Sequence, residues 1–241
     1  MEKMKVSINE RFKKSIFEHG KGVLRLISHL EDLIEYCGGN VKKLKLAAIY
    51  HDVGKLLWPE ELFEKPKILL TELDWIKIHS HPEMGVQILK NTKNGHLSSG
   101  NPSVLDIIFL HHEKIDGSGY YRIKELPVEV AFLSICDIFQ ATTTTRPYRN
   151  SMPIDIAIML ALSPWYGFLQ DEILKETKIR LLDSPGIEKQ KSICQPYRDQ
   201  IEIHQTCQTQ TYQTYQIKQR FNEEVCYDKG YDEYNEDEYN E

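Results

Sequence analysis

The sequence has no CxxC pair. Its five cysteines are scattered along 241 residues, at positions 37, 136, 194, 207 and 226. An odd number of cysteines at such spacing argues against a disulfide framework and favours a reducing compartment. We therefore expect a cytoplasmic protein whose fold does not depend on covalent cross-links.

Long apolar runs are also missing. No segment approaches the roughly 20 apolar residues that are needed to cross a bilayer, so we expect no membrane span. The first fourteen residues, MEKMKVSINERFKK, are charged, and no apolar segment follows them, so we expect no secretion signal. We identify no receiver or sensor domain before residue 9. Regulatory input is therefore expected from a separate protein or from the C-terminal segment.

An excess of positive charge is absent as well. The formal net charge is −6, with 30 lysines and arginines against 36 aspartates and glutamates. This balance gives no support for binding to a nucleic-acid polymer. A phosphate group would have to be bound by a local cluster of charges. Since 41% of the residues are hydrophobic, the chain can still bury a core.

Patterns typical of β-strands are missing from residues 9–185, where apolar side chains recur at three- and four-residue steps. A long helix is predicted over residues 9–36, with Gly38 and Gly39 ending it and Asn40 capping the next helix. Thr71 is predicted to cap a short helix, and Pro82 and Pro127 are predicted to open two others. Further helices are expected at residues 104–112 and 154–162. The fold class that follows is all-α, a helical bundle.

The composition changes after about residue 190. The segment 205–219 is rich in Gln, Thr and Tyr, and the chain ends in the acidic stretch DKGYDEYNEDEYNE. Such a segment buries too little apolar surface to offset its ordering entropy. We therefore predict one domain over residues 1–185 and a disordered polar tail over residues 186–241. A solvated tail is favoured over a docking arm.

The stretch IYHDVGK at residues 49–55 carries the first chemical signal. His51 and Asp52 offer a nitrogen and an oxygen ligand that could bridge two cations, and Lys55 adds a positive charge nearby. Most adjacent His-Asp pairs lie on solvated surfaces. This pair, however, continues the apolar stripe of Ala47 and Ala48, so we expect it to be buried.

Other histidines and one further aspartate also fall at helix ends or on core-facing stripes. The full set is His19, His51, His81, His111, His112, Asp52 and Asp137. Helical bundles hold metals with side chains that project inward in this way, and nitrogen and oxygen ligands suit iron, manganese or zinc. Seven ligands are too many for one ion but suit two ions about 3.5–4 Å apart that share a carboxylate. Taken alone, His19 is more simply explained as a core histidine with satisfied hydrogen bonds.

The order of the motifs HDVGK, HPEMG, HHEKIDGSGY, LPVEVAFLSICDIF and RPYR resembles the HD superfamily of metal-dependent phosphohydrolases. Within it, the chain is most similar to the HD-GYP group, the cyclic di-GMP phosphodiesterases. The resemblance runs from about residue 19 to residue 151. It implies a bundle of the HD type with a metal centre in its core. It also implies that the seven residues above are metal ligands, with Asp52 bridging the ions.

The resemblance assigns further roles. Lys55 matches the lysine that contacts the substrate phosphate, and Arg146 and Arg149 match basic positions that hold the phosphodiester. Gly119 and Tyr120 belong to the signature loop beside the active site, which is also implicated in contacts with signalling proteins. Some members hold a third metal with a glutamate at the position of Ser15, so two divalent ions, iron or manganese, are expected here.

Three departures from the family pattern stand out. The signature Gly-Tyr-Pro is Gly119-Tyr120-Tyr121 in this chain, and since proline fixes a backbone angle, its absence is expected to loosen the loop. The following segment, residues 122–126, is shorter than usual. A family aspartate is replaced by Gln140, so a carboxylate behind the metal ligands is missing. We expect these changes to affect the preference for cyclic di-GMP more than metal binding.

The resulting hypothesis is a metal-dependent phosphodiesterase that hydrolyses cyclic di-GMP to pGpG, with Asp52 and Lys55 in the catalytic centre. The sequence leaves open whether hydrolysis continues to GMP. One alternative keeps the chemistry but changes the substrate to another cyclic dinucleotide or nucleotide. Another is a degenerate, non-catalytic module that signals through protein contacts of residues 116–121 or of the tail. The intact ligand set favours the hydrolase. The sequence leaves the oligomeric state open.

Overall fold

The chain folds into helices throughout the part that the structure describes, a computed structural model of residues 8–59, 61–62, 65–92, 95–145 and 151–184. These residues contain no strand, only an isolated bridge between Tyr166 and Leu169. The all-α prediction is therefore confirmed for them. They belong to one compact unit, Met1–Cys194. The predicted tail at residues 186–241 lies outside the described residues.

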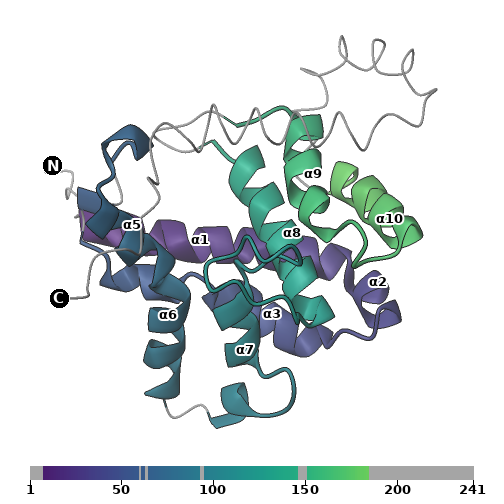
Figure 1. The fold of residues 1–241 in the computed structure, drawn as a ribbon, viewed down its shortest axis with the longest axis horizontal. Coiled ribbons are helices and arrows are strands. Elements are labelled where there is room, and N and C mark those ends of the chain that lie inside the picture. Colours follow the sequence, from purple (N-terminus) through teal and green to yellow (C-terminus); the bar gives the residue numbers. More distant parts are fainter. Residues whose placement is uncertain (1–7, 60, 63–64, 93–94, 146–150, 185–241) are drawn as a thin grey trace, which may run out of the picture. The chain divides into compact units, whose positions relative to one another are not determined.

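The helices follow one another as shown in Figure 1. The first half contains α1 (Ile8–His29), α2 (Glu31–Tyr36), α3 (Val41–Tyr50), η1 (Val53–Leu57), η2 (Lys67–Leu69), α5 (Glu72–His79) and α6 (His81–Lys90). The second half contains η3 (Gly95–Ser98), α7 (Val104–Leu110), α8 (Val128–Thr143), α9 (Ile154–Leu162), η4 (Ser163–Trp165) and α10 (Asp171–Leu182). None of these helices combines the length and apolar character that crossing a bilayer requires.

The predicted helix over residues 9–36 is in fact two helices. The chain leaves the helical conformation at Leu30, where φ is −106° and ψ is 10°. The Leu30 N–H still donates to the carbonyls of Leu26 and Ile27, and its side chain is fully buried. The apolar stripe thus continues across the break, which explains why periodicity alone predicted one element.

Helix starts agree with the capping signals in the sequence. Asn40 accepts a hydrogen bond at the start of α3, as predicted. Thr71 and Asp74 form a capping box at the start of α5, and Ser103 and Asp106 form a second one at the start of α7. Such caps stabilise a helix by about 1 kcal/mol each, and they fix where the chain enters each helix.

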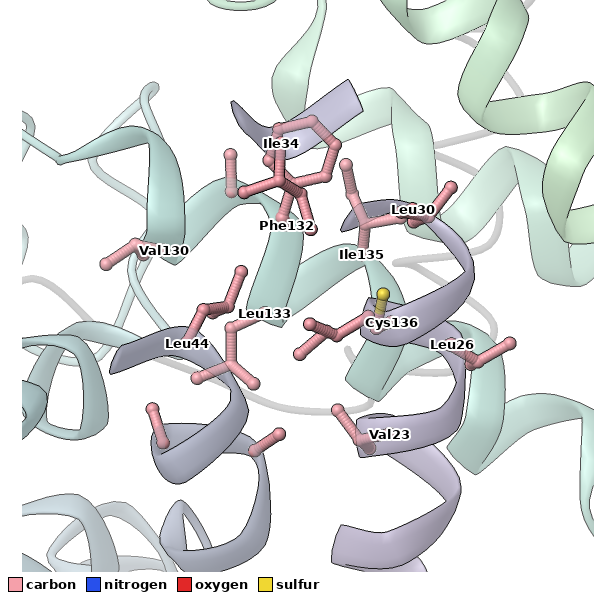
Figure 2. Close-up of a cluster of buried hydrophobic side chains, with 14 of the residues drawn as sticks. Val23, Leu26, Leu30, Ile34, Leu44, Val130, Phe132, Leu133, Ile135 and Cys136 are labelled. Carbon is pink, nitrogen blue, oxygen red and sulfur yellow. The ribbon is translucent and has the colours of Figure 1, made fainter. Parts of the chain in front are cut away.

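The hydrophobic core is built around α8, which packs against α1, α3 and α9. Figure 2 shows side chains from α1, α3 and α8 that point toward one another, among them Val23, Leu44, Leu133 and Cys136. Full burial of a leucine or phenylalanine side chain contributes about 1.5–3 kcal/mol, so this core supplies a large share of the stability. The rigid arrangement of α1, α3 and α8 also fixes the polar residues that these helices carry.

Candidate metal centre

Most of the predicted metal ligands lie at or next to helix ends and form one cluster. His51 caps the C-terminal end of α3, and Asp52 follows it. His81 begins α6, His111 follows α7, and Asp137 lies within α8. All five are buried, with exposed fractions of 0%, 4%, 1%, 0% and 8% respectively. Polar side chains are rarely buried unless they are paired or bind a metal, so this cluster requires an explanation.

A close contact between η1 and α6 brings Asp52 to His81. A Cβ atom on Gly54 would lie 1.9 Å from the His81 carbonyl oxygen and 2.6 Å from the Gly85 nitrogen, so only glycine fits. As a result, the His81 Nε2 atom lies 3.3 Å from Asp52 Oδ1. The glycine of the HDVGK motif thus permits the approach that assembles the cluster.

Three of the imidazoles are oriented in the same way. His51, His81 and His111 each donate Nδ1–H to the carbonyl three residues earlier, at 2.9, 2.6 and 2.6 Å. A neutral histidine with its proton on Nδ1 carries a lone pair on Nε2. Hydrogen bonds of this kind are typical of metal-binding histidines, because they fix the tautomer and the ring orientation.

The Nε2 lone pairs of His81 and His111 point at each other, and the Nε2 atom of His112 lies beside them. His81 Nε2 lies 3.3 Å from His111 Nε2 and 3.2 Å from His112 Nε2. Within the described part of the chain, His51 Nε2 and Asp52 Oδ1 are buried without a hydrogen-bond partner. Electron pairs at these distances repel unless a cation lies among them. The donor set therefore fits a metal ion.

The residues divide into overlapping groups in which all ligand atoms lie within 4.8 Å of one another. These groups are His81, His111 and His112; His19, His51 and Asp52; and His51, His111 and Asp137. All seven residues singled out in the sequence are thus brought together. The two oxygens of Asp52 face different groups, since Oδ1 is 3.3 Å from His81 Nε2 and Oδ2 is 3.8 Å from His19 Nε2.

His19 lies inside the cluster. Its Nε2 is 2.8 Å from Asp137 Oδ1, and its Nδ1 contacts the amide oxygen of Gln140. Both ring nitrogens of His19 therefore have a polar neighbour inside the cluster. Gln140, identified in the sequence as a missing carboxylate, retains an acceptor for His19 but without a charge.

Lys55 lies at the edge of the cluster. Its Nζ donates to Asp52 Oδ2 at 2.6 Å and lies 5.6 Å from the centre of the Trp58 ring. Trp58 in turn donates its indole N–H to the carbonyl of Lys77 in α5, at 3.1 Å. Since the Lys55 side chain is 20% exposed, a ligand anion could reach its ammonium group. Arg146 and Arg149, predicted to contact the same anion, lie outside the described residues.

Charges in the cluster keep its carboxylates ionised. Burial by itself would raise the pKa of Asp52, but Lys55 and then His51 lower it well below its ordinary value. Burial would also raise the pKa of Asp137, yet the hydrogen bond from His19 and the nearby imidazole of His51 bring it well below its ordinary value. Both aspartates therefore carry negative charge near neutral pH.

The imidazoles are mostly neutral. Burial lowers the pKa of His81, lowers that of His111 to about 3 and lowers that of His112 well below its ordinary value. Burial also acts to lower the pKa of His51, but the two aspartates outweigh it and the pKa is raised. Two ionised carboxylates among imidazole nitrogens form a donor set that suits a divalent cation.

The signature loop packs against the cluster. The Tyr120 ring lies 4.5 Å from the His112 ring and 4.3 Å from the His79 ring, measured between centroids. A Cβ atom on Gly119 would lie 2.5 Å from the Glu113 Cα atom, so the loop approaches the segment that follows α7 closely at this position. Tyr120 therefore lies beside the candidate ligand His112, and Gly119 lies beside Glu113. Their contact with a substrate stays a prediction.

Sequence reasoning missed one buried residue of this region. Glu113 has no exposed surface, and its two carboxylate oxygens accept the backbone N–H groups of Tyr121 and Ile123, both at 2.8 Å. It directly follows the two histidines of HHEKIDGSGY. A charged residue next to two buried histidines was the available signal, but its partners are backbone amides that no side-chain pattern reveals.

The chain is similar to known proteins in both sequence and fold. A family model described as "HD domain" matches residues 16–162. The chain is 34% identical over 144 residues to 3'3'-cGAMP-specific phosphodiesterase 1 of Vibrio cholerae, covering 58% of this chain and 31% of that protein. It is 26% identical over 162 residues to cyclic di-GMP phosphodiesterase PA4108 of Pseudomonas aeruginosa, covering 66% of this chain and 37% of that protein. The chain thus spans about a third of the length of these relatives.

A solved structure shares the fold. The crystal structure of the Listeria monocytogenes phosphodiesterase PgpH HD domain in complex with cyclic-di-AMP superimposes with a TM-score of 0.52 at 21% sequence identity. The match covers 80% of this chain and 93% of that one. The helical arrangement of the described residues is therefore one that occurs in HD domains.

Proposed function

Because the chain belongs to the HD domain family, we propose that it is a metal-dependent phosphodiesterase that hydrolyses a cyclic dinucleotide, with cyclic di-GMP as the favoured substrate. The observation that supports this most is the cluster of converging, unpaired ligand atoms. His81 Nε2 faces two other imidazole nitrogens, and Asp52 Oδ1 is buried without a hydrogen-bond partner among the described residues. The names of the relatives support the substrate class.

We assign two metal positions that share Asp52. His81, His111 and His112 form the group on the Oδ1 side of Asp52. On its Oδ2 side we place His19 and His51, whose Nε2 atoms lie 3.8 and 3.7 Å from Oδ2, together with Asp137, which both histidines also approach. Nitrogen and oxygen ligands without thiolates suit iron or manganese. Bound divalent ions at such a site would activate a water molecule and withdraw charge from the phosphodiester.

The residues around the two positions have separate tasks. The Nδ1 hydrogen bonds of His51, His81 and His111 keep the Nε2 atoms aimed at the cluster. Lys55 would leave Asp52 for a phosphate oxygen and stabilise the charge that develops there. Tyr120 packs its ring against that of His112 and so supports this ligand from one side. Cleavage of one phosphodiester bond of cyclic di-GMP yields linear pGpG, and a second cleavage yields GMP.

The test combines metal content with turnover on the same sample. The protein is purified without oxygen, its metals are measured by mass spectrometry, and cyclic di-GMP and 3'3'-cGAMP are offered separately. We expect about two ions of iron or manganese per chain and release of linear products. Asp52→Asn should lose both metal and turnover, whereas Asp155→Asn, an exposed aspartate in α9, should retain both.

Three outcomes would contradict the proposal in different ways. Turnover that survives Asp52→Asn would show that the cluster is not the catalytic centre. Two metals without turnover of either cyclic dinucleotide would refute the substrate class. Less than one metal per chain would refute the binuclear centre and favour a non-catalytic module.

A further inference from the structure

Tyr121, the residue that replaces the signature proline, contacts three separate parts of the fold. Its backbone N–H donates to Glu113 Oε1 at 2.8 Å. Its ring stacks on that of Phe109 in α7, with centroids 4.5 Å apart and planes inclined by 20°. Its hydroxyl donates to the carbonyl of His79, the last residue of α5, at 3.2 Å. A proline could make neither of the two hydrogen bonds.

We infer that Tyr121 is a positioning residue, which holds Tyr120 against the candidate metal ligand His112. The inference rests on the proposed function in so far as His112 binds a metal. Tyr120 packs its ring against both His79 and His112. Since Tyr121 bonds to the carbonyl of His79, it fixes one of these two neighbours as well as the loop that carries Tyr120.

His112 depends on ring packing more than the other candidate ligands do. His51, His81 and His111 are each held by an Nδ1 hydrogen bond to a backbone carbonyl, and no such bond of His112 lies among the described residues. Its ring packs on those of Tyr120 and His111, with centroids 4.5 and 4.0 Å away. A shift of Tyr120 would therefore be transmitted directly to this ligand.

The loop conformation itself depends on the amide at position 121. Glu113 accepts the amides on either side of Arg122, whose φ of 59° lies in the left-handed region that arginine rarely adopts. The buried carboxylate offsets this strain by bonding both amides. Replacement of Tyr121 by proline would restore the family signature but would leave Glu113 Oε1 without that donor. The tyrosine and the carboxylate thus act as a matched pair in this chain.

Two variants separate the contacts, and a third is the control. Tyr121→Phe removes only the hydroxyl bond to His79, whereas Tyr121→Pro also removes the amide bond to Glu113. Tyr166→Phe makes the same chemical change at an exposed tyrosine after η4. All three are compared with the unaltered chain by circular dichroism, so that unfolded variants are set aside. If Tyr121→Pro does not fold, the inference is tested with Tyr121→Phe alone.

The first readout needs neither substrate nor turnover. Hydrogen–deuterium exchange is followed in peptides that cover residues 72–81 and 113–125. Loss of one hydrogen bond should speed exchange there by about two- to tenfold in Tyr121→Phe, and by more in Tyr121→Pro. Titration of the metal-free protein with Mn²⁺ should show a dissociation constant raised by a similar factor. Tyr166→Phe should leave exchange and Mn²⁺ affinity unchanged.

The second readout is kinetic. If the chain hydrolyses cyclic di-GMP, Tyr121→Phe should lower kcat about two- to tenfold at saturating Mn²⁺ with little change in KM, because ligand geometry rather than substrate contact is altered. Wild-type exchange and Mn²⁺ affinity in both Tyr121 variants would overturn the inference, even with an active enzyme. Altered exchange and affinity in a chain without turnover would support it and refute the proposed function instead.

Discussion

Gly54→Ala is the substitution that most sharply tests how the cluster is assembled. The added Cβ would lie 1.9 Å from the His81 carbonyl oxygen, and contacts below 3.0 Å are essentially never seen for a real Cβ atom. The backbone of η1 and that of α6 must therefore move apart by about 1 Å. His81 begins α6, so its Nε2 atom would move away from Asp52 Oδ1, which is now 3.3 Å distant.

The cost can be compared with overpacking in protein cores, which is typically about 1–3 kcal/mol. Here the obstructing atoms are backbone, so we expect about 3 kcal/mol or more. For a domain of this size that corresponds to a fall in Tm of roughly 6–12 °C. Metal binding should suffer more than stability, because a displacement of about 1 Å disrupts a coordination geometry that tolerates only about 0.2 Å.

Gly85→Ala is the matched control, since it places a methyl group on the other side of the same contact. Its Cβ would lie 3.3 Å from the Gly54 nitrogen and 3.4 Å from Val53 Cγ1, which small shifts can accommodate. The assay is thermal unfolding with metal analysis of each purified variant. Full metal content in Gly54→Ala, with Tm within about 2 °C of the parent, would refute the reasoning.

Three further substitutions probe charges at increasing distance from the cluster. Lys55→Met should retain its metals but lower kcat/KM for cyclic di-GMP by about 100-fold or more, because it removes a charge opposite the phosphate. Unchanged kinetics with intact metals would show that Lys55 does not stabilise the substrate phosphate. Glu113→Gln should lower the free energy of unfolding in urea by about 1–3 kcal/mol, because an amide group then faces a buried backbone N–H. An unchanged urea midpoint would show that the loop at residues 121–123 does not need the carboxylate. Arg180→Ala breaks an ion pair with Asp32, whose side chain is 70% exposed, and should lower the free energy of unfolding by less than about 1 kcal/mol in the same urea assay. A larger loss would mean that this ion pair between α10 and α2 contributes substantially to stability.

Much of the fold could be predicted because most helices have local sequence signals, such as capping residues and apolar periodicity. Asn40 and Thr71 cap the helices that they were expected to cap, and α9 begins and ends at the predicted residues. The break at Leu30 was missed because its side chain fits the apolar stripe on both sides. Helix α10 was not predicted, since its buried face includes the polar Thr177 while Ile179 is exposed.

The candidate metal ligands could be predicted from the sequence, but the residues that hold the neighbouring loop in place could not. Buried histidines and aspartates at helix ends are visible as a sequence pattern, and the structure brings all seven together. The role of Glu113 depends on the path of residues 121–123, and that path is set by packing and by the left-handed Arg122. The loss of the signature proline predicted a loose loop. The structure instead shows contacts of Tyr121 that hold it.

The central claim is that the buried cluster holds two metal ions that share Asp52. Crystals grown with Mn²⁺ and measured for anomalous scattering test it most directly. We expect two anomalous peaks on either side of the Asp52 carboxylate, one next to His81, His111 and His112 and the other next to His19, His51 and Asp137. Absence of both peaks at saturating Mn²⁺, or peaks only elsewhere on the chain, would contradict it.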